Sequence, residues 1–382
     1  MISNGRGRGN TAPFLDERWF MYNPFDNFDM QKKEPIILGI ESSCDETAAA
    51  VIRGRKILSD EIASSATIQA QFGGVVPEIA SRAHTDEIAR VVDNAVKNAG
   101  ITYADIDAVA VTYGAGLLGA LLVGVSFAKA LAYSLNKPLI AVNHIRGHLA
   151  AAYLDSPDLQ TPFVTLLASG GHTAILYAKS EGEFEILGAT LDDAAGEAFD
   201  KVARVLGLQY PGGPHIERCA KEGKANVAMP KMLKGLGGYN FSYSGLKTAV
   251  INYCHTKEQK GETFSKADVA ASFQSAAVDI LIEKTVEAAK EKGVSTVTAG
   301  GGVVANGYLR ENLQKACDKA GLRLVLPERR YCTDNAAMIA SEGLVQYRLG
   351  NFADMTLTAK ASIPLAATLE TVQSRRAAEK GV

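Results

Sequence analysis

The fold is decided by two stretches, IILGIESSCDETAAAVI at residues 36–52 and FVTLLASGGHTAILY at residues 163–177. Each stretch reads as an apolar strand, a polar turn and a second apolar strand. Later in each half, a strand (residues 108–112 and 296–299) leads into a glycine-containing loop and a helix. This weak duplication of element order favours an α/β protein with two related lobes and a cleft between them.

Size and composition agree with two domains in a globular protein. The chain has 382 residues, of which 47% are hydrophobic and 21% charged. The formal net charge of -2 gives no global signal for nucleic acid, so such a substrate would need a local basic patch or basic partner proteins. The five cysteines are odd in number and form no C-x-x-C pair, which predicts reduced thiols in a cytoplasmic protein.

The expected divisions of the chain follow from composition. Residues 1–34 predict a disordered or tag-like extension, and Met30 is an alternative start. Residues 35–160 would form the N-terminal lobe, 161–345 the C-terminal lobe, and 346–382 a segment that could pack back on the first lobe. The apolar stretch 115–128 is shorter than the roughly 20 residues of a membrane helix, and we expect a buried loop and helix without membrane or secretory signals.

Several helix boundaries are also expected. A helix over residues 86–99 would be capped by Thr85, another would begin near His144, and a long one would be capped by Ser265. A strand is expected at residues 322–326.

Two polar turns could bind a phosphate or a cation. The turn at residues 41–47 carries two hydroxyls together with Asp45 and Glu46, and a carboxylate there could hold a cation or accept a proton. The turn Ser169-Gly170-Gly171-His172-Thr173 would expose backbone N–H groups to an anion. Each could equally be a plain solvated turn.

Three consecutive glycines at residues 300–302, followed by Asn306, would let a nucleotide approach the backbone closely. The pattern is not G-x-G-x-x-G, and no Gly-Lys-Ser/Thr follows, so dinucleotide and P-loop enzymes are disfavoured. Asp200, Gly213 and Glu217 could serve a ribose, although exposed helix acids would look the same.

His144 and His148 stand four residues apart on an expected helix, so both can face one metal ion. A packed or surface pair is the alternative. Asp334, which could instead be a simple helix cap, would complete a set of two histidines and a carboxylate, typical of iron and suitable for zinc. A zinc protease would need Glu after the first histidine, and Ile145 occupies that position.

Together these motifs resemble the tRNA threonylcarbamoyladenosine biosynthesis transferase family, whose bacterial form is TsaD and which was once labelled a glycoprotein endopeptidase family. The resemblance covers residue 35 to about residue 365. The motifs that carry it are GIESSCDET at 39–47, GGVVPEIASR at 73–82, NHIRGHL at 143–149, SGGHT at 169–173, DK at 200–201, YPGG at 210–213, FSYSGLK at 241–247, the glycine triplet with Asn306, and CTDN at 332–335.

The resemblance implies a duplicated two-lobed fold of the actin, sugar-kinase and Hsp70 kind. It implies one divalent metal ion, Fe(II) or Zn(II), on His144, His148 and Asp334. The adenylate of the substrate would lie on Leu167, Ala168, Ser169, Gly170, Gly171, Asp200, Gly213, Glu217 and Asn306. The chain departs from the family at Glu217, where Asp is common, and at Ala115, where Pro is usual.

The implied reaction transfers a threonylcarbamoyl group from threonylcarbamoyl-AMP to N6 of the adenosine beside the anticodon, position 37, in tRNAs reading codons that begin with A. AMP leaves, and Asp45 or Glu46 could accept the proton. The implied partners are tRNA, a paralogous subunit that pairs with the first lobe, and a small ATPase. Candidate tRNA contacts are Lys231, Lys234, Lys247, Arg329, Arg330 and, for stacking, Tyr243.

Three other functions compete with this interpretation. A metalloprotease lacks its general base, and a sugar or acetate kinase of the same fold seldom uses a two-histidine metal site. A non-catalytic binding module is disfavoured by the intact metal and glycine motifs.

Overall fold

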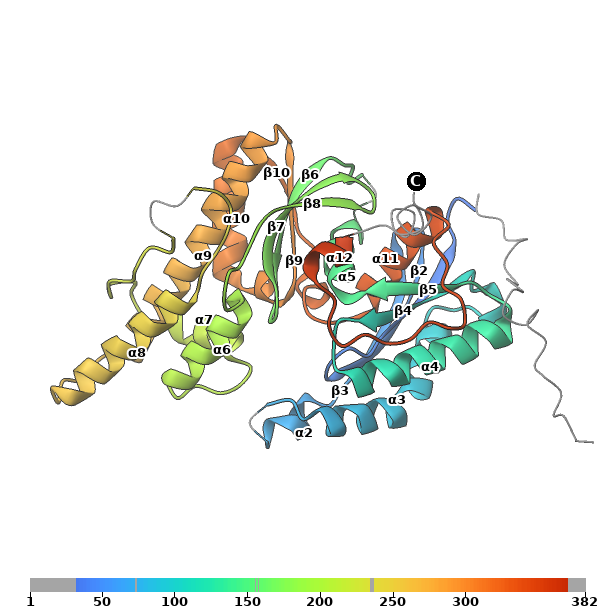
Figure 1. Cartoon of the computed structure of the whole chain (residues 1–382), viewed down its shortest axis with the longest axis horizontal. Helices are drawn as coiled ribbons and strands as arrows, with labels where there is room; N and C mark the ends of the chain where they lie inside the picture. The colour runs from blue at the N-terminus through green and yellow to red at the C-terminus, as the bar shows by residue number, and fades with distance from the viewer. Residues whose placement is uncertain (1–31, 73, 155, 157, 234–236, 370–382) are drawn as a thin grey trace, which may run out of the picture.

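The computed structural model describes residues 32–369 except 73, 155, 157 and 234–236. The expected extension therefore lies outside the described residues up to residue 31, as do residues 370–382. Figure 1 shows two α/β lobes side by side, joined through the helices α5 and α11.

The first lobe is built on a five-stranded sheet in the order β3-β2-β1-β4-β5. β1 pairs antiparallel with β2 and parallel with β4, and β4 pairs parallel with β5. The strands are β1 (Ile36–Glu41), β2 (Glu46–Arg53), β3 (Lys56–Ser64), β4 (Ala108–Gly114) and β5 (Leu139–Asn143).

The second sheet repeats this arrangement, because its order β10-β9-β6-β7-β8, read from the opposite edge, is the first order with each strand replaced by its counterpart. β6 pairs antiparallel with β7 and parallel with β9, as β1 does with β2 and β4. The strands are β6 (Phe163–Ala168), β7 (Thr173–Ser180), β8 (Glu183–Ala189), β9 (Thr296–Gly300) and β10 (Arg323–Val325). The duplication expected from element order is thus confirmed in the topology.

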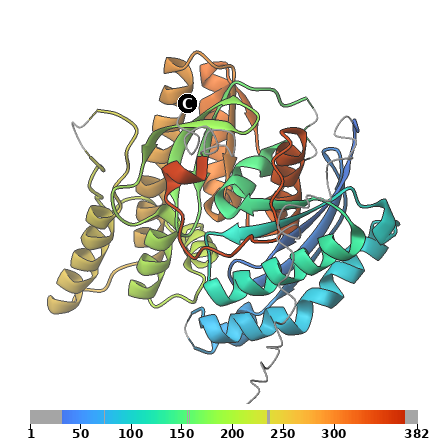
Figure 2. The ribbon, with the colours of Figure 1, turned by 45° about the vertical axis from the view of Figure 1, so that its right-hand side comes forward.

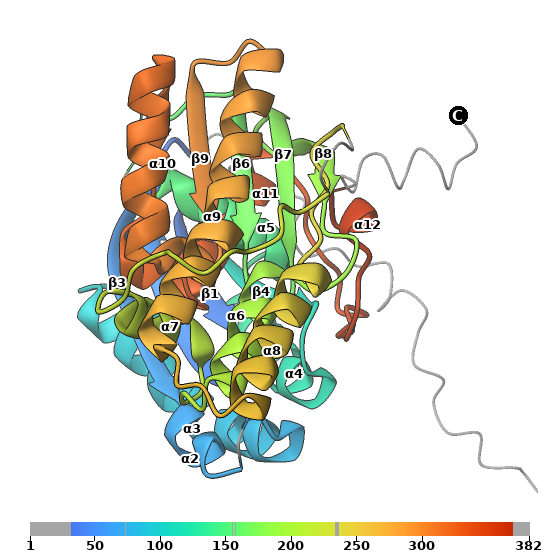
Figure 3. The same cartoon turned by 90° about the vertical axis from the view of Figure 1, so that its left-hand side faces the viewer.

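Helices cover both sheets. In the first lobe α3 and α4 run along one face and α11 packs on β1, β2 and β4 (Figure 2). In the second lobe α7, α8 and α9 lie together (Figure 3). The helices are α2 (Ala66–Ala70), α3 (Pro77–Asn98), α4 (Leu118–Leu135), α5 (His144–Ala150), α6 (Ala195–Val205), α7 (Gly212–Ala220), α8 (Ser244–Gln259), α9 (Lys266–Glu291), α10 (Gly307–Ala320), α11 (Ala336–Arg348) and α12 (Leu365–Leu369), with short 3-10 turns η1 (Tyr103–Asp105), η2 (Ala151–Tyr153), η3 (Gly302–Ala305) and η4 (Arg329–Tyr331).

The close packing of α11 on the first sheet depends on a glycine in β1. A Cβ on Gly39 would lie 2.5 Å from the carbonyl oxygen of Ala336 and 2.6 Å from the amide nitrogen of Ala340. All six residues of β1 are buried, since helices cover the sheet on both faces. α11 is thereby fixed against the strand that leads into the first polar turn.

One helix start differs from the sequence prediction, and one apolar helix is less buried than expected. α3 begins at Pro77, with proline in the first turn and Glu78 beside it, so Thr85 is interior and donates its hydroxyl to the Ser81 carbonyl at 3.1 Å. The apolar helix α4 runs on to Leu135, and the helix expected to be buried is exposed on one face, at Leu118, Leu122 and Tyr133. Among the described helices it alone is long and apolar enough to cross a membrane by length and composition, and here it packs against α3 and β4.

The chain crosses between the lobes twice, and both crossings carry candidate ligands. The first runs from β5 through α5 and η2 to β6; the second runs from β10 through η4 to α11. α5 and α11 pack against each other. Residues that follow α11 return to the first lobe, where the Ala353 amide donates to the Leu139 carbonyl and the Lys360 amide to the Tyr113 carbonyl, both at 2.8 Å.

Candidate metal and nucleotide site

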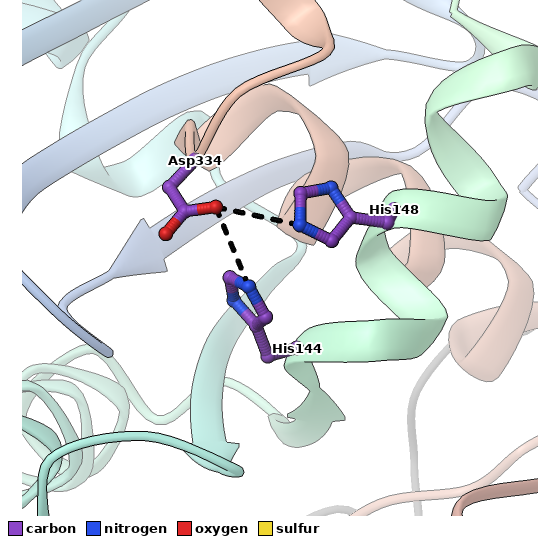
Figure 4. A group of neighbouring side chains, drawn as sticks. All are labelled: His144, His148 and Asp334. Atoms are coloured by element: carbon purple, nitrogen blue, oxygen red, sulfur yellow. Dashed lines mark ion pairs between the residues drawn. The ribbon is translucent and has the colours of Figure 1, made fainter. Parts of the chain in front are cut away.

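The two crossings bring His144, His148 and Asp334 together (Figure 4). Asn143 caps α5 by accepting the Ile145 amide at 2.8 Å, and this starts the helix at the first histidine. Nε2 of each histidine then lies 3.4 Å from Oδ1 of Asp334. The i, i+4 spacing therefore places both imidazoles on the side of α5 that faces the second crossing.

The donor set suits a divalent metal ion. One ligand atom from each residue lies within 4.8 Å of the other two. Ligands bound at about 2.1 Å with a tetrahedral angle would stand about 3.4 Å apart, the spacing found from each histidine to the carboxylate. Two imidazoles and one carboxylate are donors that iron and zinc accept.

Asp334 is available because its neighbour caps the helix. The side chain of Asn335 accepts the Met338 amide at 2.9 Å at the start of α11. The alternative interpretation, that Asp334 is the N-cap of α11, is therefore wrong. Its side chain is about a quarter exposed, at 26%, and is directed at the two histidines.

The charges within the cluster shift the pKa values of its members. Burial alone would disfavour the charged form of His144, but the carboxylates of Asp334 and Glu41 outweigh it and hold the pKa of His144 well above its ordinary value. Burial likewise acts against ionised Asp334, yet the two histidines bring the pKa of that carboxyl well below its usual range. Burial and the neighbouring His144 lower the pKa of His148. The site thus combines an ionised carboxylate with two nitrogen donors.

Two further residues face this cluster and were not among the predicted site residues. Oε2 of Glu41 lies 3.1 Å from Nδ1 of His144. His172, in the second polar turn, is placed so that burial, His144 and His148 lower its pKa to about 4. Both residues belong to motifs that were noted in the sequence, but only the tertiary structure places them beside α5.

The first polar turn carries a carboxylate pair. Burial and the adjacent Asp45 raise the pKa of Glu46 to about 9, so Glu46 keeps its proton at neutral pH. His84 of α3 contacts this turn with both ring nitrogens. Its Nδ1 lies 2.7 Å from Oγ1 of Thr47, and its Nε2 lies 3.0 Å from the Cys44 carbonyl oxygen.

The glycines predicted to admit a nucleotide have open space beside them. A Cβ placed on Gly170, Gly171 or Gly213 would meet no atom within 4 Å, and the same holds for Gly302. Leu167 and Ala168 are buried in β6 directly before this turn. A ligand could therefore approach the backbone at these positions.

Three of the polar residues predicted to bind the nucleotide already have protein partners. Asp200 accepts the Gly212 amide at 2.6 Å, and Glu217 accepts the Gly307 amide at 3.2 Å. Asn306 caps α10 and donates to Gln274 at 2.9 Å. These contacts fix the loops that contain Gly213 and Gly302. A ribose would have to bind to the hydrogen-bonding positions that these side chains still have available.

The structure places the candidate tRNA contacts in different surroundings. Tyr243 is fully buried, with its hydroxyl directed at the Ala277 carbonyl, so the stacking prediction is wrong. Lys247 forms an ion pair with Asp193 at 3.0 Å, and Arg330 forms one with Glu328. Lys234 lies outside the described residues.

Fold and site together define the chain as a two-lobed α/β protein with a His-His-Asp cluster where the lobes join. Solved structures support the fold. Full-length HypF in its phosphate- and nucleotide-bound form matches with a TM-score of 0.57 at 16% identity, covering 84% of this chain and 57% of that one. HypF from T. kodakarensis matches with a TM-score of 0.55 at 16% identity, covering 85% and 49%.

Sequence relatives specify the family. The family model of TsaD, tRNA N6-adenosine threonylcarbamoyltransferase, matches residues 56–341. Transferases of that name from Clostridium perfringens (strain SM101) and Clostridium botulinum (strain Kyoto) are 52% and 51% identical over 88% and 87% of this chain, and each is covered over 99% of its length. The chain belongs to the tRNA N6-adenosine threonylcarbamoyltransferase family and is a transferase, as its motifs predicted.

Proposed function

We propose that this chain transfers the threonylcarbamoyl group of threonylcarbamoyl-AMP to N6 of adenosine 37 in tRNAs that read codons beginning with A. The observation that supports this proposal most is that His144, His148 and Asp334 come together where the lobes join, in a member of this transferase family. The comparisons support neither a metalloprotease nor a small-molecule kinase.

In the reaction, the N6 amine would form a bond to the carbamoyl carbon while the bond from that carbon to the phosphate oxygen breaks. AMP leaves with the bonding electron pair, and the amine loses a proton. Backbone N–H groups of the turn at Gly170 and Gly171, beside which the structure is open, suit the charge of the departing phosphate. Gly213 and Gly302 would give the adenosine similar access.

His144, His148 and Asp334 would hold one divalent ion, Fe(II) or Zn(II). Such an ion, when bound, supplies a Lewis acid that polarises the carbonyl of the transferred group. Two imidazoles and a single carboxylate leave coordination positions open for that carbonyl.

The proton acceptor would come from the first polar turn. Since Glu46 keeps its proton at neutral pH, we assign proton acceptance to Asp45 and hydrogen-bond donation to Glu46. Single-turnover rates of Asp45→Ala and Glu46→Ala test this assignment. A near-normal rate in Asp45→Ala would remove Asp45 from the reaction.

We further propose that the chain works in the cytoplasm with a paralogous subunit and a small ATPase. The net charge of -2 supports a need for partners that help to hold the polyanionic tRNA. Omission of each partner from the transfer assay tests that need.

The decisive experiment is single-turnover transfer of labelled threonylcarbamoyl from threonylcarbamoyl-AMP to unmodified tRNA, with the partners present. We expect transfer by the wild type and its loss in His144→Ala. His255→Ala, an exposed histidine on α8, is the matched control and should behave as wild type. If folded, metal-loaded wild-type protein transfers nothing, the proposed reaction is wrong.

A further inference from the structure

Glu41, the last residue of β1, is a carboxylate with no solvent-exposed surface. A buried carboxylate is costly unless its oxygens are hydrogen-bonded. Oε1 accepts the backbone amide of Ser43 at 2.5 Å, and Oε2 accepts the hydroxyl of Thr112 at 2.7 Å. The remaining contact of Oε2 is Nδ1 of His144, at 3.1 Å.

This last contact determines which nitrogen of His144 carries the proton. An ionised carboxylate has no proton to give, so Nδ1 must donate. The donors already on its two oxygens, the Ser43 amide and the Thr112 hydroxyl, favour the charged form of Glu41. Whenever His144 is neutral, a proton held on Nδ1 leaves the lone pair of Nε2 on the side of Asp334, 3.4 Å away.

The second histidine lacks such support. Nδ1 of His148 is buried and has no hydrogen-bond partner among the described residues. The two imidazoles therefore differ: His144 is fixed in orientation and tautomer by a charged partner, whereas His148 depends on the packing of α5.

We propose that Glu41 is a positioning residue that fixes the tautomer and orientation of His144, and thereby makes His144 the stronger of the two imidazole ligands. A carboxylate behind a histidine ligand also raises the basicity of the ligand nitrogen. The metal-binding consequence rests on the proposed function, whereas the tautomer of His144 does not.

Ser43 is the competing partner, since its Oγ also lies 3.1 Å from Nδ1 of His144. The hydroxyl can turn to donate or accept, so it does not by itself select a tautomer. A charge-assisted hydrogen bond to Glu41 is also stronger than one to a neutral hydroxyl.

Glu41→Gln is the informative variant because it keeps the shape of the side chain. The Ser43 amide can only donate, so it will hold the Gln carbonyl in the place of Oε1. The Gln amino group then faces Nδ1 of His144 and favours the tautomer with its proton on Nε2, which has no lone pair for a metal.

Two measurements read this out. Nitrogen-15 spectra of the six histidines in metal-free protein, recorded at an alkaline pH where His144 is neutral, report the tautomer of His144, and competition titration with Zn²⁺ alone reports affinity. We expect Glu41→Gln to change the tautomer and to weaken Zn²⁺ binding by about 10–100-fold. Thr112→Val, which removes another bond to the same carboxylate, and Ser43→Ala should each keep the tautomer and bind Zn²⁺ within about threefold of wild type.

Other outcomes would overturn the proposal. One is a folded Glu41→Gln protein that keeps the wild-type tautomer and Zn²⁺ affinity. Another is a change of tautomer in Ser43→Ala, which would assign the positioning to the hydroxyl. If Glu41→Gln does not fold, the wild-type spectrum decides, since a neutral His144 with its proton on Nε2 contradicts the proposal. Wild-type protein that binds no Zn²⁺ would count against the metal centre of the proposed function, while the spectra still decide the tautomer.

Discussion

Removing the negative charge of Glu342 should destabilise the packing of α5, which carries His144 and His148, against α11, which begins just after Asp334. Arg146 lies on α5 between the two histidines, and its Nε donates to Oε1 of Glu342 on α11 at 2.5 Å. The two side chains are only 7% and 3% exposed. Glu342→Gln keeps the volume but leaves the guanidinium as an uncompensated buried charge, which should lower the free energy of unfolding by about 3–5 kcal/mol.

The double variant Arg146→Met/Glu342→Leu isolates the cause. Replacing a buried pair by apolar residues is often neutral. The remaining cost should be about 1–3 kcal/mol, because the Gly182 carbonyl loses its donor at 3.0 Å and the Gln346 amide loses its acceptor at 2.5 Å. Urea unfolding of wild type, single and double variants measures both values. A loss below about 1 kcal/mol in Glu342→Gln, or a double variant no more stable than the single, would refute the reasoning.

Three further predictions concern the surroundings of the site. His84→Ala removes the contacts to Thr47 and to the Cys44 carbonyl. The single-turnover rate should fall about tenfold, which corresponds to an activation barrier higher by about 1.4 kcal/mol. A normal rate in folded protein would show that the turn keeps its conformation without His84. Burial raises the pKa of Asp60 from 3.8 to about 6. The folded protein then keeps a proton that the unfolded chain has released, so stability falls as the pH rises through that window. Since one pKa unit is about 1.4 kcal/mol, Asp60→Asn should add up to about 3 kcal/mol at neutral pH and nothing below about pH 4; an equal gain at both pH values in thermal unfolding would contradict this. Gly213→Ala meets no atom in the protein, so stability should persist while AMP binding, measured by calorimetry, weakens about tenfold or more; unchanged affinity would place the nucleotide elsewhere.

Sequence periodicity was sufficient for most of the elements and for the two histidines of the metal cluster. The spacing of His144 and His148 is a local property of a helix, so a single sequence predicts that the two share a face. The start of α3 was misplaced because Thr85 and the acids after it resemble a helix start, although Pro77 had already begun the helix. Tyr243 was misjudged because a tyrosine in a polar motif gives no local sign of burial.

The rest of the cluster depends on strand register, which no local pattern encodes. β1 and β4 are parallel with Ile40 opposite Val111, and β4 and β5 are parallel with Thr112 opposite Val142. Glu41, Thr112 and His144 therefore emerge at the same edge, the carboxyl ends of three adjacent parallel strands, where open α/β sheets place their ligands. Asp334 reaches that edge only because the chain crosses back from the second lobe to lay α11 on the first sheet. The sequence pointed to His144, His148 and Asp334 but not to Glu41 or Thr112 as site residues. The pairing of β4 with β1 and β5, together with the return crossing, brings all of them to one edge.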